Sequence, residues 1–152
     1  MTKYILTLFV LLTSSASLGD TVADQLLEFR PDENNNEVRD DVDQKIAELY
    51  GEDPKKVYLA TNYAKTMQRI AQSSSNLEYA RTQILTMNAI DACWRELTED
   101  DIRGGIWPTV LNTYGVSKSF LSVQRSVGES LPRISLDEYD QHLEENRSIL
   151  CP

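Results

Sequence analysis

The chain has 152 residues, of which 41% are hydrophobic and 26% charged, and its 24 acidic and 15 basic residues give a formal net charge of -9 at pH 7. This composition is that of one ordinary globular domain. It excludes a chain that is disordered throughout, a collagen, a disulfide-dense miniprotein and a polytopic membrane protein. The acidic balance also disfavours unaided binding to nucleic acid or to anionic lipid, so neither is an expected partner.

The first 19 residues have the three-part pattern of a secretory signal peptide. Lys3 supplies the positive end, residues 4–12 form an apolar run, and small polar residues follow up to Gly19. A membrane-spanning helix needs about 20 apolar residues, so the run is too short to span a bilayer. The pattern predicts a cleaved signal over 1–19 and a secreted or periplasmic protein with no membrane attachment after cleavage. The alternative is an uncleaved anchor or a buried first helix.

Two cysteines, Cys93 and Cys151, remain after the predicted cleavage. In an oxidising compartment an even number of cysteines usually pairs. The sequence therefore predicts one disulfide that fixes the C-terminal segment to the element carrying Cys93, the alternative being two buried free thiols. A catalytic thiol is disfavoured because no CxxC spacing occurs and the single histidine is not near either cysteine in the sequence.

Apolar residues at helical spacing predict two amphipathic helices in the first half of the globular part. The first has an apolar stripe over 38–49, is otherwise very acidic, and ends at Gly51. Asp53 followed by Pro54 is typical of an N-cap and a proline in the first helical turn. The pattern then continues to Ala71 as a second helix.

A third helix is predicted over 76–97, opened by a capping box from Ser75 to Glu78. Its apolar residues cover most of the helix circumference, so we expect it at the centre of the fold. Residues 98–101 are typical of another helix start, which Gly104 and Gly105 are expected to end as a hinge or tight turn.

Two further helices complete the predicted fold. One has its apolar stripe over 116–127 with Gly128 as the C-terminal stop, and the last runs from a capping box at Ser135 into Cys151. No convincing pair of strands is found. The sequence predicts an all-α fold, a compact antiparallel bundle of four to five helices stapled by one disulfide. We expect an acidic, flexible N-terminal segment over 20–35 and a single helical domain over 36–152.

Charge is distributed unevenly along the chain. The segment from Asp20 to Asp53 contains 12 acidic and 3 basic residues, residues 54–97 contain 3 and 6, and the segment from Ser135 to Pro152 contains 5 and 1. One interpretation is that the acidic first helix lies against the basic second helix as an ordinary solvated surface. The other is that an acidic face recruits a basic partner, because complementary charge raises association rates and selects partners.

Five residues with side-chain oxygens occur at positions 1, 3, 5, 9 and 12 of an EF-hand-like loop, the spacing that calcium coordination needs. They are Asp32, Asn34, Asn36, Asp40 and Asp43. The match fails because Glu37 stands where the sharp turn needs glycine, and because the last ligand is Asp instead of a bidentate Glu. We therefore expect a polar linker and not a calcium site.

A second weak metal candidate lies on the last predicted helix. Glu138, His142 and Glu145 are spaced so that all three side chains can point to one side of that helix. Nothing elsewhere in the sequence completes a ligand shell, and a lone surface imidazole that pairs with Glu is the commoner case. The sequence thus predicts no metal, no cofactor and no catalytic residue.

The third predicted helix carries a polar stripe on one side, formed by Arg81, Asn88, Asp91 and Arg95. If this stripe were enclosed, the guanidinium groups could hold a carboxylate or phosphate of a ligand. If it faces solvent, Asp91 and Arg95 form an ordinary helix ion pair one turn apart. We keep these four residues as a candidate ligand or anion contact.

The leading hypothesis is a small exported helical protein that acts by non-catalytic binding, through an acidic face, to a basic protein or peptide. It depends on the lack of any recognisable catalytic motif, which is weak evidence because catalytic carboxylates can come from distant positions. The alternatives are a small secreted enzyme or metal-dependent protein, with Asp91, His142 and Glu138 as acid-base candidates, and a carrier of an apolar ligand between helices.

Overall fold

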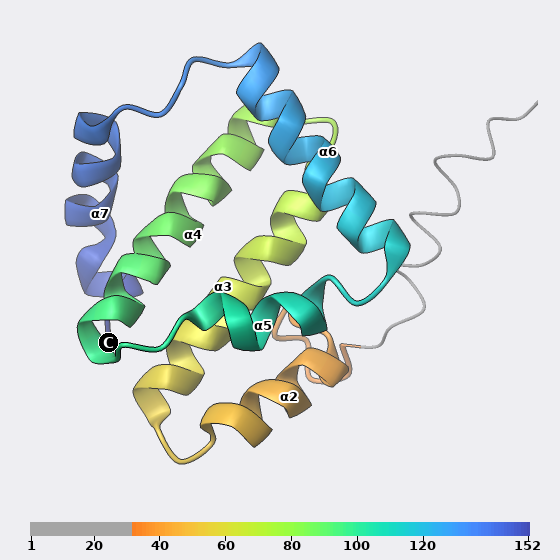
Figure 1. Ribbon diagram of the computed structural model, residues 1–152, viewed down its shortest axis with the longest axis vertical. Coiled ribbons are helices and arrows are strands. Elements are labelled where there is room, and N and C mark those ends of the chain that lie inside the picture. The colour runs from red at the N-terminus through yellow and green to blue at the C-terminus, as the bar shows by residue number, and fades with distance from the viewer. Residues whose placement is uncertain (1–31) are drawn as a thin grey trace, which may run out of the picture.

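The computed structural model describes residues 32–152, which are helical with no strand (Figure 1). The predicted signal peptide lies outside the described residues, as does the segment over 20–35 except for 32–35. The all-α prediction is confirmed, with six helices in the described part instead of four to five. The helices are α2 (Asp40–Tyr50), α3 (Pro54–Gln72), α4 (Leu77–Leu97), α5 (Ile102–Val110), α6 (Tyr114–Ser130) and α7 (Leu136–Leu150).

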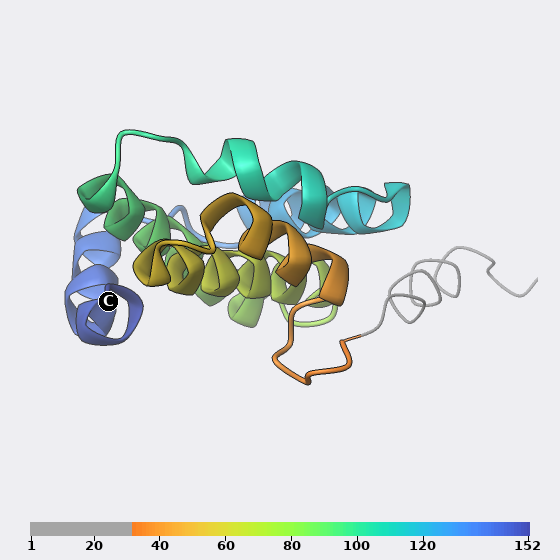
Figure 2. The same ribbon diagram turned by 90° about the horizontal axis from the view of Figure 1, so that it is seen from below.

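Helices α3 and α4 form an antiparallel pair at the centre of the fold, as the apolar circumference of α4 predicts. Helix α4 contacts α3, α6 and α7, and Figure 1 shows α6 and α7 on opposite sides of it. Helices α2 and α5 contact each other and both pack on α3. Figure 2 shows α5 on one side of the α3 and α4 pair. The largest fully buried side chains come from several helices and include Tyr63, Ile90, Trp94 and Phe120.

Trp94 connects α4 to two neighbouring elements. The indole ring is fully buried and meets the ring of Tyr50 edge-on, with the ring centroids 5.0 Å apart. Its Nε1–H donates to the backbone carbonyl of Asp100 at 2.8 Å, so the one polar atom of the buried ring is satisfied. This single side chain therefore fixes α2 and the loop after α4 against the core.

The predicted helix starts are largely confirmed by their caps. The Asp53 side chain accepts from the backbone N–H groups of Lys55 and Lys56, and the Ser135 hydroxyl accepts from the N–H of Glu138. At the start of α4 the predicted cap is wrong by one residue. Asn76, not Ser75, is the N-cap, and its side chain accepts from the N–H of Tyr79.

The prediction that Gly104 and Gly105 end a helix is wrong, because both lie inside α5. A Cβ at position 105 would lie 2.3 Å from the Tyr50 hydroxyl, so any larger residue there would displace the Tyr50 side chain where α2 approaches α5. Pro108 also lies inside α5. Proline has no backbone N–H, so Pro108 cannot donate to the Gly104 carbonyl four residues earlier. Gly104 is exposed, so that carbonyl is accessible to water.

The prediction that Gly128 ends the helix with the apolar stripe over 116–127 is also wrong. Helix α6 continues through Gly128 to Ser130, and nothing lies within 4 Å of a Cβ placed on that glycine. The helix ends at Leu131, which has an extended backbone conformation with φ -116° and ψ 156°. Pro132 follows, and a residue before proline is driven out of the helical region by steric contact with the proline ring.

The predicted disulfide between Cys93 and Cys151 is confirmed, with their Cα atoms 5.3 Å apart. It joins α4 to the end of α7. Helix α7 contains no fully buried residue, and half-buried side chains such as Leu143 and Leu150 make its apolar contact with the core. The last helix therefore has little packing of its own, and the covalent bond restricts how far it can move from α4.

Replacing both cysteines by alanine tests how much the fold depends on this bond. The disulfide closes a loop across a sequence separation of 58 residues. In the chain-entropy model its loss lowers the free energy of unfolding by about 4 kcal/mol. We expect this loss in equilibrium urea unfolding, with the backbone amides of α7 gaining hydrogen exchange before those of α3. An unchanged unfolding midpoint would contradict the structural role of the disulfide.

Candidate functional site

The most enclosed ionic group in the described structure is the carboxylate of Asp91 on α4, which is 4% exposed. Its Oδ2 atom accepts from Arg95, one turn further along the same helix, and from Arg103 Nη2 on α5 at 2.8 Å. The two arginine side chains are 68% and 45% exposed. One buried carboxylate thus holds two solvent-facing guanidinium groups and joins α4 to α5.

Tyr63 on α3 adds a neutral hydroxyl to this group. Its Oη accepts from Trp107 Nε1 at 3.0 Å, and its ring is 1% exposed. Burial raises the pKa of Tyr63, and the hydrogen bond with Trp107 only partly opposes this. The pKa of Arg103 is raised chiefly by the charge of Asp91. We call Asp91, Arg95, Arg103, Tyr63 and Trp107 the Asp91 cluster.

The structure divides the polar stripe that the sequence proposes as an anion contact. Asp91 and Arg95 are brought together, but Arg81 lies ten residues before Asp91, about 15 Å along the helix. Arg81 binds Glu138 on α7, with Nη2 to Oε2 at 2.7 Å, and Asn88 contributes its backbone carbonyl to the hydroxyl of Tyr139 at 3.4 Å. The two ends of the stripe therefore contact different helices, α7 at Arg81 and Asn88 and α5 at Asp91.

The weak metal candidate on α7 is also divided between different partners. Glu138 pairs with Arg81, His142 Nε2 lies 3.1 Å from the Thr86 hydroxyl, and Glu145 accepts from Gln141 at 2.8 Å. Across residues 32–152, no three His, Cys, Asp or Glu side chains converge so as to hold a metal ion. The acid-base candidates Asp91, His142 and Glu138 are likewise engaged by separate neighbours.

Residues 32–39 form a folded loop that leads into the first turn of α2, where the sequence predicts a polar linker. The Asp32 carboxylate accepts from the backbone N–H groups of Asn36 and Glu37 at 3.1 and 2.9 Å. Asn35 and Glu37 have left-handed backbones with φ of 56° and 68°. Glu37 therefore adopts the conformation that glycine supplies at this position of an EF-hand loop, with Asp32 holding the turn.

The other residues of the EF-hand-like spacing also meet within this loop. The side-chain amides of Asn34 and Asn36 donate to Asp43 Oδ2 at 2.9 and 2.7 Å, and Asp40 Oδ1 accepts from the N–H of Glu33 at 3.1 Å. The polar side chains of the loop are thus hydrogen-bonded to one another and to its backbone.

Arg39 connects this loop to the rest of the fold. Its side chain forms two hydrogen bonds with Asp41 and also donates to the carbonyls of Thr109 and Val110 and to the side chain of Asn112. Its exposed fraction is only 6%. One guanidinium therefore neutralises the C-terminal end of α5 and ties it to the start of α2.

Two hollows lie at the surface of α3. A polar one of about 260 Å³ lies between α3 and the loop and is lined by residues that include Arg39, Gln68 and Arg69. A larger one of about 620 Å³ is an open trough along one face of α3, with Val57 and Tyr58 in its lining. The first hollow is thus lined mainly by polar residues, and the second is open to solvent along its length.

The structure separates the carboxylates that stabilise the fold from those that are free. The four carboxylates of α2 all have partners among the described residues: Asp40 at the loop backbone, Asp41 at Arg39, Asp43 at the asparagines and Glu48 at Lys45. The predicted first helix, α2, does lie against α3. The ion pairs with α3, however, come from Glu37 in the loop before α2, which binds Lys65 and Arg69. Most of the described carboxylates before α3 therefore serve internal contacts.

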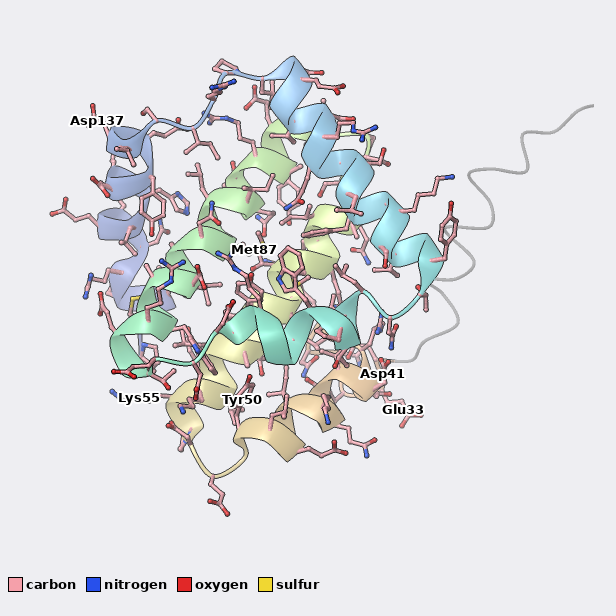
Figure 3. The ribbon with its side chains drawn as sticks, viewed as in Figure 1. Glu33, Asp41, Tyr50, Lys55, Met87 and Asp137 are labelled. Carbon is pink, nitrogen blue, oxygen red and sulfur yellow. A yellow bond between two sulfur atoms is a disulfide. The ribbon has the colours of Figure 1, made fainter. Side chains whose placement is uncertain are left out.

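Helix α7 has an outer face on which the carboxylates are free. Asp137, Asp140 and Glu144 are exposed, and within the described chain they have no hydrogen-bond or ion-pair partner. Their spacing of three and four residues places them on one side of the helix. Figure 3 shows Asp137 at the start of α7, at the edge of the molecule. We call these three residues the α7 acidic face.

No protein-family model, curated protein or solved structure matches the chain. Within residues 32–152, no helix has both the length and the apolar character to cross a membrane. Function therefore has to be inferred from the geometry of the site.

The Asp91 cluster predicts a larger loss of stability from removing the buried carboxylate than from removing an exposed arginine. Asp91→Asn removes the negative charge that two guanidinium groups share and leaves only a neutral amide oxygen, so we expect the free energy of unfolding to fall by about 1–3 kcal/mol. Arg95→Gln should cost less than about 1 kcal/mol because that side chain is exposed. Urea unfolding of both variants checks the order, and equal losses would contradict it.

The Arg81–Glu138 pair predicts a pH-dependent contribution to stability. The hydrogen bond from Arg81 is the main cause that lowers the pKa of Glu138 from its ordinary 4.5. The pair therefore stabilises the fold above the unfolded-state pKa, and this contribution is lost as the pH falls through the lowered pKa of the folded state.

The variant Glu138→Gln tests this dependence. The difference in melting temperature between wild type and Glu138→Gln should be present at pH 7 and shrink below about pH 4.5. Glu129→Gln removes an exposed carboxylate on α6 that has no ion-pair partner in the described chain, and it serves as the control. A difference for Glu138→Gln that stays constant down to pH 3 would contradict the assignment.

Proposed function

We propose that this protein is a small exported binding protein without catalytic activity, and that it recruits a basic protein or peptide through the α7 acidic face. The observation that carries the proposal is the group of three exposed, unpartnered carboxylates on one side of α7. Helix α7 carries five acidic residues and one basic residue in all. A group of like charges on one face attracts a cationic surface and speeds its approach.

Exposed apolar side chains also lie at the two ends of α7, Leu136 next to Asp137 and Ile149 on another side of the helix. Leu136 and Ile149 are 79% and 65% exposed. Exposed charges contribute mainly to association rate and partner choice, whereas buried apolar contact provides much of the affinity. A basic partner with apolar groups beside its cations would therefore match α7 better than a uniformly charged polymer.

Export is supported by two independent features. The chain begins with the pattern of a signal peptide, and Cys93 and Cys151 are paired in a bond typical of oxidising compartments. We propose that the mature chain is secreted or periplasmic, where binding to a basic partner takes place.

A charge-neutralised variant tests the binding proposal. The triple variant D137N/D140N/E144Q removes the three charges of the α7 acidic face. The control E52Q/E99Q/E129Q removes three exposed carboxylates elsewhere and so has the same net charge. Each protein is immobilised and exposed to the exported protein fraction of its own host, and bound proteins are identified by mass spectrometry.

We expect wild type and the control to retain the same basic protein and the α7 variant to lose it. Retention should weaken steeply between low salt and about 0.5 M salt, because exposed charges are screened at that ionic strength. Equal retention by the α7 variant would overturn the proposed face. Binding that is unaffected by salt would overturn the electrostatic mechanism.

A further inference from the structure

Helix α6 exposes a face that is both apolar and basic. Its outer side carries Tyr114, Lys118, Leu121 and Arg125, spaced by four, three and four residues. Tyr114 is 80% exposed and Leu121 is 57% exposed. The Lys118 ammonium lies 5.9 Å from the centroid of the Tyr114 ring. We call these four residues the α6 basic face.

The inner side of α6 explains why this outer face has no neighbour within the molecule. Val116, Phe120, Val123 and Val127 are buried against the core, where α6 contacts α3 and α4. The apolar residues that the fold needs from α6 are thus already used. Tyr114 and Leu121 are additional apolar side chains beyond that set.

We propose that the α6 basic face of one copy binds the α7 acidic face of a second copy, so that the protein associates head to tail. This inference rests on the proposed function of α7 and names the α6 face of another copy as one basic partner for it. The observation that carries it is the match in charge and spacing between the two faces.

The spacing of the charges permits both ion pairs at once. Lys118 and Arg125 are seven residues apart, as are Asp137 and Glu144. Seven residues span about two turns, roughly 10 Å, on any α-helix. Two cations on α6 can therefore face two carboxylates on α7 in a single register, with Leu121 between them.

The two faces have to belong to different copies. Helices α6 and α7 lie on opposite sides of α4, so their outer faces point away from each other (Figure 1). When two different faces pair, a dimer still has one free α6 face and one free α7 face. Further copies can therefore add at either end. Since exposed ion pairs are weak and screened by salt, association is expected at high protein concentration and low salt.

Charge reversal tests the proposal through two complementary variants. K118E/R125E makes the α6 face acidic, and D137K/E144K makes the α7 face basic. The control E52K/E99K makes the same charge change as the α7 variant at two exposed positions elsewhere. Circular dichroism and melting temperature establish that each variant is folded, and sedimentation velocity in low and high salt measures association.

We expect wild type and the control to show a mean mass that rises with concentration in low salt and falls to that of the monomer in about 0.5 M salt. Each reversed variant alone should stay monomeric. An equimolar mixture of the two should associate again, because each then offers the face that the other lacks. A wild type that stays monomeric, or a mixture that does not associate, would overturn the proposal.

The same variants separate this inference from the proposed function. K118E/R125E retains the α7 acidic face and should still capture the host partner. If that capture persists while the mixture fails to associate, self-association alone is wrong. If the mixture associates while no host protein is captured in a manner that depends on α7, the proposal of a separate basic partner is wrong.

Discussion

Burial of α4 on most of its sides is the constraint on which the other elements depend. A helix that is apolar around most of its circumference needs neighbours on each side, and α3, α6 and α7 supply them. Trp94 adds a second requirement, because its buried indole N–H needs an acceptor inside the fold. The backbone carbonyl of Asp100, in the loop leading to α5, supplies it. The cover provided by α7 contains no fully buried side chain, and a disulfide secures it.

Local signals in the sequence predict the elements whose ends are set by local chemistry. The caps at Asp53 and Ser135 and the stop at Gly51 act within one helical turn, and so could be recognised from neighbouring residues. Helix α5 could not, because Gly105 packs closely against the Tyr50 hydroxyl of a helix about fifty residues earlier in the chain. A glycine that permits close packing and a glycine that ends a helix look alike in sequence.

In the candidate sites, too, local spacing predicts some contacts, whereas contacts with distant residues could not be predicted. The ion pair of Asp91 with Arg95 is visible as a spacing of four residues, but Arg103 and Tyr63 join it from other helices and leave no mark in the sequence near Asp91. The charge of α7 could be counted from sequence. Which carboxylates are free could not, since Glu138 is engaged by Arg81 and Asp137 is not. The sequence likewise could not show that the carboxylates of α2 are engaged within the fold, and for that reason α2 is not the binding face proposed here.

Arg39 is a position at which the contacts of the fold restrict which amino acid can be accepted. Its planar guanidinium satisfies a carboxylate and two helix-end carbonyls at once, in a space that leaves it almost no contact with water. A lysine would keep the charge but present a single ammonium with no fork, so it could not reach these acceptors together. Position 39 is therefore expected to resist even the most conservative replacement over evolutionary time, whereas positions on the outer surface of α7 are free to change with whatever they bind.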